Sequence, residues 1–228
     1  MSDPSNESPI NALPPIVVAL ALLIFGVELV FYLGNRGLIG GQDALGWRLD
    51  AMREYAFSGP VLRWMIETGQ WPVEHLKRFV TYPFLHRDFP HLLMVIVFLL
   101  ALGKMVGEVF GTLAVLIVFF GASITGALAY GLIIDTELVL FGGFPAVYGL
   151  IGSYTFMIWL SLGIAGQSRL GAFQLIGILI GLQLVFGAIF GSNNGWVADL
   201  AGFATGFALS FLLVPGAIRR LRDKLRQR

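Results

Sequence analysis

Cysteine is absent from the 228-residue chain, and only 13% of the residues are charged. The missing thiols exclude disulfides, thiol catalysis and thiolate metal sites. A soluble domain would carry roughly 25% charged residues, whereas this chain is 57% hydrophobic with a mean hydropathy of +0.80. The composition therefore predicts a protein that crosses the lipid bilayer several times. The net charge of +1 says little by itself, and we expect no nucleic-acid partner.

Basic residues are also missing from the N-terminal segment. Residues 1–11 are polar but contain no Lys or Arg, so they lack the positively charged start of a cleavable signal peptide. We therefore expect the first apolar segment to stay in the mature protein, preceded by a disordered tail over residues 1–13. The membrane domain is expected over residues 14–216, followed by a basic tail over residues 217–228.

Six apolar segments are long enough to cross a bilayer as helices, for which about 20 residues are needed. They run over Ile16 to about Leu33, about His91 to Val109, Thr112 to Ile134, the uncharged run Leu138 to Ala165, Leu170 to about Phe190, and Trp196 to Val214. A long loop over about residues 34–90 separates the first two, and its apolar residues recur at helical spacing, which predicts one or two amphipathic helices. The predicted fold class is an all-α membrane protein, a bundle of six transmembrane helices with a long, partly helical first loop.

The charge of the C-terminal tail predicts the orientation. Residues 217–228 contain six basic residues against one acid, Asp223. Because Lys and Arg near span ends mark the cytoplasmic side, the C-terminus is expected in the cytoplasm, and six spans place the N-terminus there too. The basic residues of the first loop do not oppose this, because long loops translocate largely regardless of charge. We expect a bacterial inner (plasma) membrane.

The stretch Phe141–Gly152 is an unusual sequence for a membrane helix, because it contains a Gly-Gly pair, a proline and two further glycines. Glycine permits bends and close helix contacts, and proline favours the first turn of a helix. We predict an extended approach segment, a helix that begins near Phe144–Pro145, and close packing along Gly149 and Gly152. Small residues spaced four apart in other spans predict compact helix packing as well.

Two acids, Glu28 and Asp199, lie inside the predicted spans, where a charged residue costs ~2.5–3.5 kcal/mol on insertion scales and normally has a partner. One hypothesis combines Asp199 with His91 and a nucleophile for catalysis. The other is that His91, His86 or Tyr148 neutralises or hydrogen-bonds Asp199 and so joins the second, fourth and sixth spans. The two histidines are five apart, which is not a helical ligand spacing, and we expect no metal or other cofactor.

Three segments resemble the rhomboid family of intramembrane serine proteases, which have six spans. Phe84–Val95 is similar to the family's second span, Gly142–Gly152 to the start of its fourth, and Ala198–Gly206 to its sixth. Arg78 falls where the family often has an arginine in its first loop. The long first loop and the short later loops match too, so the resemblance covers most of the chain and implies a six-span rhomboid-like bundle.

The resemblance also implies where the family's catalytic groups fall. Its serine falls at Phe144, the following glycine at Pro145, its histidine at Asp199, and the asparagine that helps to hold the oxyanion at Val95. A phenyl ring carries no nucleophile and a valine no hydrogen-bond donor. We therefore expect a catalytically inactive member with no catalytic residue, in which framework positions are kept: His91, Tyr148, Gly152, Gly202 and Gly206.

Three functions remain as hypotheses. The first is an inactive scaffold that binds transmembrane segments or membrane-protein clients in a cleft lined by His86, His91, Tyr148 and Asp199. The alternative is an intramembrane serine-type endopeptidase that cleaves with displaced residues. A minor alternative is a small-solute or proton-coupled transporter, which rests on Glu28 and Asp199 but lacks inverted repeats. The oligomeric state is left open.

Overall fold

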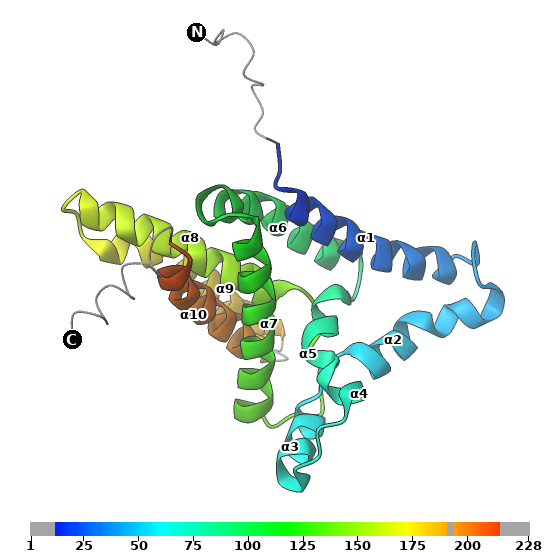
Figure 1. Ribbon diagram of the computed structural model, residues 1–228. Coiled ribbons are helices and arrows are strands. Elements are labelled where there is room, and N and C mark those ends of the chain that lie inside the picture. Colours follow the sequence, from blue (N-terminus) through cyan, green and yellow to red (C-terminus); the bar gives the residue numbers. More distant parts are fainter. Residues whose placement is uncertain (1–11, 191–193, 215–228) are drawn as a thin grey trace, which may run out of the picture.

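The computed structural model describes residues 12–190 and 194–214, and this part of the chain is almost entirely helical (Figure 1). The tails expected over residues 1–13 and 217–228 lie wholly or mostly outside the described residues. Most of the turn between the fifth and sixth spans, residues 191–193, lies outside them as well.

Six helices are long and apolar enough to cross a membrane, as predicted. They are α1 (Pro15–Asn35), α6 (Phe89–Phe110), α7 (Thr112–Ile133), α8 (Phe144–Ile164), α9 (Gln174–Phe190) and α10 (Trp196–Leu213). The fifth span begins with the short 3-10 helix η4 (Arg169–Phe173), which leads directly into α9. The predicted fold class, an all-α rhomboid-like bundle of six membrane helices, is therefore confirmed.

Helices α7, α8 and α10 form the tightest part of the bundle, and α8 and α10 lie side by side in Figure 1. Because glycine has no side chain, the backbones of α8 and α10 come into direct contact. Gly206 lies against Gly149, Gly202 against Pro145, and Gly152 against the carbonyl of Phe203. A Cβ atom at any of the three would overlap the facing backbone. We call these contacts the glycine seam, and they confirm the close packing predicted along Gly149 and Gly152.

Polar side chains add hydrogen bonds next to the seam. Ser153 Oγ donates to the carbonyl oxygen of Gly206 over 3.1 Å, and the hydroxyls of Thr125 and Thr205 are 2.6 Å apart. In lipid, where apolar contact alone gives helices little reason to associate, close backbone packing and such hydrogen bonds hold them together.

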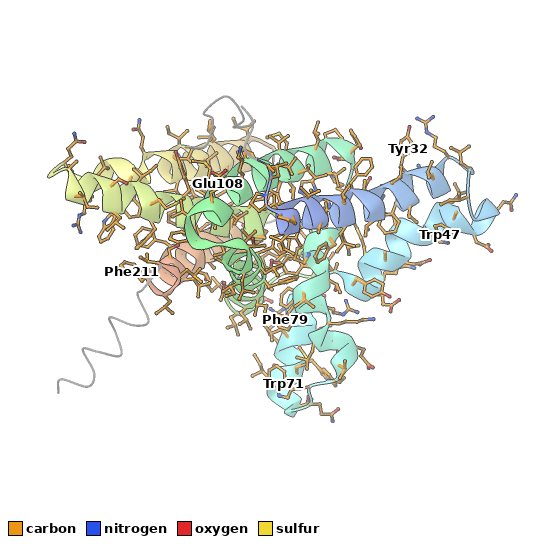
Figure 2. The ribbon with its side chains drawn as sticks, turned by 45° about the horizontal axis from the view of Figure 1, so that its top comes forward. Tyr32, Trp47, Trp71, Phe79, Glu108 and Phe211 are labelled. Atoms are coloured by element: carbon orange, nitrogen blue, oxygen red, sulfur yellow. The ribbon has the colours of Figure 1, made fainter. Side chains whose placement is uncertain are left out.

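The long loop contains the helices that its apolar spacing predicts. It forms η2 (Gly41–Gly46), α2 (Trp47–Tyr55), α3 (Gly59–Thr68), α4 (Val73–Leu76), α5 (Arg78–Thr81) and η3 (Tyr82–Phe84). Helix α3 is strongly amphipathic and buries Leu62 and Met65, whereas no residue of α2 is fully buried. Figure 2 shows Trp71 at the tip of this loop and Phe79 closer to the bundle.

The loop is fixed to the bundle at the C-terminal end of α7. Arg63 of α3 donates to the carbonyl oxygens of Gly131 and Ile134, each over 3.3 Å, and forms an ion pair with Asp135 at 3.1 Å. The last carbonyls of a helix have no partner within the helix, and a basic side chain satisfies them well. This contact orients the loop towards the side where α8 begins.

Candidate functional site

The segment before α8 is extended, as the sequence predicts, and it is held on two sides. Leu140 forms an antiparallel bridge with Phe57 of the long loop, with N–H to O distances of 2.8 and 2.9 Å. Gly142 has a φ of +99° and donates its N–H to the carbonyl oxygen of Tyr82 over 3.0 Å. A Cβ at Gly142 would also meet the ring of His91. Only glycine fits this bend, which places the start of α8 beside α6.

A cavity of about 190 Å³ lies at this N-terminal end of α8. Its walls come from α6 and the residues before it, from the segment ahead of α8, and from α8, α9 and α10; they include Arg87, His91, Phe141, Phe144, Gln183 and Asp199. The structure therefore brings together three of the residues singled out in the sequence, namely His91, Phe144 and Asp199. They come from the second, fourth and sixth spans.

Aromatic rings form one wall of the cavity. The ring of His91 stacks on the ring of Phe144, with centroids 5.2 Å apart and an interplanar angle of 27°. Phe141 meets His91 edge-on at 6.2 Å. Val95 follows His91 by one turn of α6 and is fully buried. It lies against Gly143, where an added Cβ would touch the Cγ1 atom of Val95. Val95 thus packs against the residue that precedes Phe144, and both Val95 and Phe144 carry hydrocarbon side chains.

The hydrogen bond to Asp199 comes from Gln183 of α9, a residue that the sequence analysis missed. Gln183 Nε2 donates to Asp199 Oδ2 over 2.8 Å, and Tyr148 Oη donates to Gln183 Oε1 over 3.3 Å. The expectation that His91, His86 or Tyr148 bonds Asp199 directly is therefore corrected: Tyr148 reaches it through Gln183. The physical reason is reach, because the Gln183 side chain enters the space between α8 and α10 from a third helix.

His86 belongs to the layer behind the cavity rather than to its wall. Its side chain is 1% exposed, its ring lies 5.2 Å from that of His91, and it is absent from the cavity lining. Burial, reinforced by the nearby His91 and Arg48, lowers the pKa of His86 to about 3. His86 is therefore a neutral, buried support for His91 and does not face the cavity as the sequence suggested.

The loop that carries His86 is held by the second intramembrane acid. Arg48 of α2 forms two hydrogen bonds with the carboxylate of Glu28, at 2.6 and 2.9 Å, and also donates to the carbonyl oxygen of His86. Glu28 is only 3% exposed. Bidentate arginine–carboxylate pairs are among the strongest charge-assisted contacts. This pair connects α1, α2 and the segment before α6, and so supports the cavity from behind.

The chemistry available at the cavity is limited. A serine protease mechanism needs a nucleophile beside a base and hydrogen-bond donors for the oxyanion. Phe144 and Val95 supply neither group. Within residues 12–190 and 194–214, no group of three or more side chains able to bind a metal is found. What the cavity offers is a carboxyl group, an amide, an imidazole, a guanidinium group and aromatic rings.

Comparison with known proteins agrees with this architecture. The sequence model of the rhomboid domain matches residues 73–216, which contain the whole cavity and five of the six candidate spans. The chain is 30% identical over 159 residues to the Bacillus subtilis (strain 168) protein named "Putative rhomboid protease YdcA", a match that covers 68% of this chain and 73% of that protein.

A second relative is the RHOMBOID-like protein 4 of Arabidopsis thaliana, with 27% identity over 137 residues. That match covers 60% of this chain but only 34% of the plant protein, so the similarity concerns one part of a longer chain. Six apolar helices, a bent approach to the fourth of them and the matched domain lead to one conclusion. This membrane protein belongs to the rhomboid family.

Proposed function

We propose that this rhomboid-family protein binds transmembrane segments of other membrane proteins and does not cleave them. The observation that carries the proposal is the cavity at the start of α8. The resemblance of the sequence implies that this cavity corresponds to the family's active site, with Phe144, Val95 and Asp199 at the positions where a cleaving enzyme needs a nucleophile, an oxyanion donor and a base.

Three serines of the spans, Ser123, Ser153 and Ser161, support this proposal. Ser123 donates to the carbonyl oxygen of Phe119 over 2.7 Å, and Ser153 to that of Gly206 over 3.1 Å. Both side chains are fully buried. Ser161 is exposed but belongs to the opposite end of α8, and it donates to the carbonyl of Met157. None of these three hydroxyls lines the cavity, so a displaced nucleophile has no evident candidate among them.

We further propose that the protein lies in a bacterial inner membrane with both termini in the cytoplasm. The basic C-terminal tail supports this orientation. The cavity then opens towards the outer face, together with the long loop and the segment before α8. Lipid and the apolar spans of clients are the expected partners, and nucleic acid is not.

Labelling with a serine-reactive fluorophosphonate probe tests the absence of cleavage, with an active rhomboid protease as the positive control. We expect labelling at background level. Labelling above background that disappears in a single Ser→Ala variant would contradict the proposal and favour the alternative of an active endopeptidase.

Binding is tested separately, by a photoreactive residue placed at position 144 in native membranes. We expect crosslinks to specific membrane proteins, whereas crosslinks to lipid alone would contradict client binding.

Transport is not proposed, because one of the two acids that suggested it is accounted for. Glu28 is held by Arg48 in a bidentate ion pair. The cavity around Asp199 is lined without Glu28.

A further inference from the structure

We propose that the clients carry a basic side chain, lysine or arginine, at the end of the span that meets the cavity, and that Asp199 is the group that recognises it. This recognition rests on the function proposed above, since it names the class of transmembrane segment that the cavity accepts.

The first argument is that Asp199 is buried but incompletely paired. Its side chain is 5% exposed and lines the cavity, and its one hydrogen bond from a described side chain is that of Gln183 to Oδ2. An ionised carboxyl group can accept about four hydrogen bonds. In the described ranges, no lysine or arginine forms an ion pair with Asp199. The carboxyl group therefore has accepting capacity left on the side of the cavity.

Glu28, a buried acid with a structural role, has a different kind of partner from Asp199. Its two carboxyl oxygens each accept from a different nitrogen of Arg48, at 2.6 and 2.9 Å. Buried acids in membranes normally have such a partner. Asp199 accepts a hydrogen bond from the amide of Gln183, whereas Glu28 accepts from a guanidinium group. A client could supply the cation that no described lysine or arginine supplies to Asp199.

Arg87, the other charged residue at the cavity, does not act as the ion-pair partner of Asp199. Arg87 lines the mouth, but its Nε bonds the carboxylate of Asp88 at 2.8 Å, and its side chain is 73% exposed. The backbone N–H of Arg87 donates to His91 Nδ1 over 3.4 Å, and the His91 ring is stacked on Phe144. Both neighbours are thus engaged with other groups.

The size and the walls of the cavity fit one side-chain end. Pockets for whole drug-sized ligands measure roughly 300–1,000 Å³, and a single water needs about 10–15 Å³. A cavity of about 190 Å³ lies between the two. Its aromatic residues Phe141 and Phe144 offer ring faces that attract a cation. An ammonium or guanidinium group would meet a carboxylate and aromatic faces together.

The experiment uses the full-length protein in phosphatidylcholine vesicles with benzoylphenylalanine in place of Phe141, a cavity-lining position. Synthetic transmembrane peptides are added that differ only at one residue near the end of the span, which is Lys, Met or Glu. We expect the Lys peptide to crosslink about tenfold more than the Met peptide, and the Glu peptide least. Tenfold corresponds to about 1.4 kcal/mol of preference.

Variants then identify the carboxyl group responsible. Asp199→Asn has nearly the same shape and is expected to crosslink the Lys and Met peptides about equally. Asp199→Glu is expected to keep a preference for the Lys peptide. Glu108→Gln is the matched control, because Glu108 lies near the other end of α6, about 26 Å from His91 along the helix axis. It should leave the tenfold preference unchanged.

The outcomes separate this inference from the proposed function. Equal crosslinking of the Lys and Met peptides to the unsubstituted protein overturns recognition of a basic residue but leaves client binding standing. Crosslinking of no peptide overturns both. A full Lys preference in Asp199→Asn overturns the role of Asp199. The comparison of peptides on the unsubstituted protein decides the matter even if a variant fails to fold.

Discussion

Along α8 and α10, the cavity and the glycine seam are neighbours, yet they tolerate different residues. The seam begins next to the cavity, where Gly202 meets the cavity-lining Pro145, and it continues along α8 and α10 to Gly152 and Gly206. In the seam, the facing groups are backbone atoms that cannot move aside. At the cavity, the facing groups are side chains around open volume.

On the proposed function, this difference would allow a rhomboid fold to persist while the residues at the cavity change. A side chain added to the seam must displace a helix, whereas a side chain changed at the cavity only alters the volume and polarity of a space that was already there. The fold depends on the seam, and the chemistry depends on the cavity. Each can change without the other.

The largest effect is expected from Gly206→Val. Its Cβ would overlap the carbonyl group of Gly149, so α8 and α10 must separate. Overpacking costs about 1–3 kcal/mol and occasionally more, and the rigid backbone partner places this variant at or above the upper end. We expect the folded protein to be lost from detergent extracts, as measured by size-exclusion chromatography and thermal unfolding.

The matched control is Gly177→Ala on α9, where an added Cβ meets nothing within 4 Å. Because alanine is favoured over glycine in a helix by roughly 0.5–1 kcal/mol, this variant should be neutral or slightly stabilising. If both variants behave alike, the seam has no special role and the comparison fails.

The second effect tests whether polar contacts behind the cavity matter as much as the seam. Arg48→Ala leaves Glu28 buried without its cation and removes the hydrogen bond to His86. Breaking a buried ion pair costs about 3–5 kcal/mol. Since the Arg48 side chain is 29% exposed and partly screened, we expect a loss of about 2–3 kcal/mol in the free energy of unfolding.

The double variant Glu28→Leu with Arg48→Leu is expected to recover most of that loss, because it leaves no unpaired charge. A double variant as unstable as Arg48→Ala would mean that the pair itself, rather than the orphaned acid, carries the stability.

A third prediction concerns pH. Burial lowers the pKa of His86 to about 3, below its ordinary value of about 6.5, so the folded protein holds this imidazole neutral. The unfolded chain binds a proton below pH 6.5 and the folded chain does not. The stability contributed by His86 is therefore complete above pH 6.5 and is lost as the pH falls towards 3.

Each pH unit in that window corresponds to about 1.4 kcal/mol, so we expect a loss of about 2 kcal/mol between pH 7 and pH 5. The measurement is the free energy of unfolding in detergent as a function of pH. His86→Gln should remove this part of the dependence, and an unchanged slope in that variant would show that His86 is not responsible.

The smallest effect on stability is expected from a double substitution at the cavity, where the chemistry would change most. Phe144→Ser with Asp199→His places a serine at a half-buried position and a histidine at a buried one, the two positions that a serine–histidine dyad would occupy, at a cost of about 1 kcal/mol. We expect no robust cleavage of a rhomboid substrate, because Val95 supplies no oxyanion donor and Pro145 follows the new serine. Full activity from this double variant would mean that only the two side chains were missing.

Much of the fold could be predicted from the sequence because a membrane helix is recognised from its own run of apolar residues. The six spans, the extended approach to α8 and the helix start at Phe144 depend on hydropathy, glycine and proline. The spacing of the glycines predicted close packing, but not that α8 meets α10 in the seam. The other features need no knowledge of which distant segments meet.

The partners of the two intramembrane acids could not be predicted in the same way. Arg48 is 20 residues from Glu28, and the fold of the long loop decides that they meet. Gln183 carries no charge, so a search for ionised groups in spans passed over it. An amide in the middle of an apolar span was nevertheless a signal, since a polar side chain in lipid seeks a partner on another helix.

The ion pair between Glu28 and Arg48 also sets an order of events during synthesis. The first span leaves the ribosome with its acid unpaired, and the guanidinium that neutralises it follows 20 residues later, in a helix that precedes every other span. The first span and α2 can therefore settle as one unit before the rest of the bundle is made.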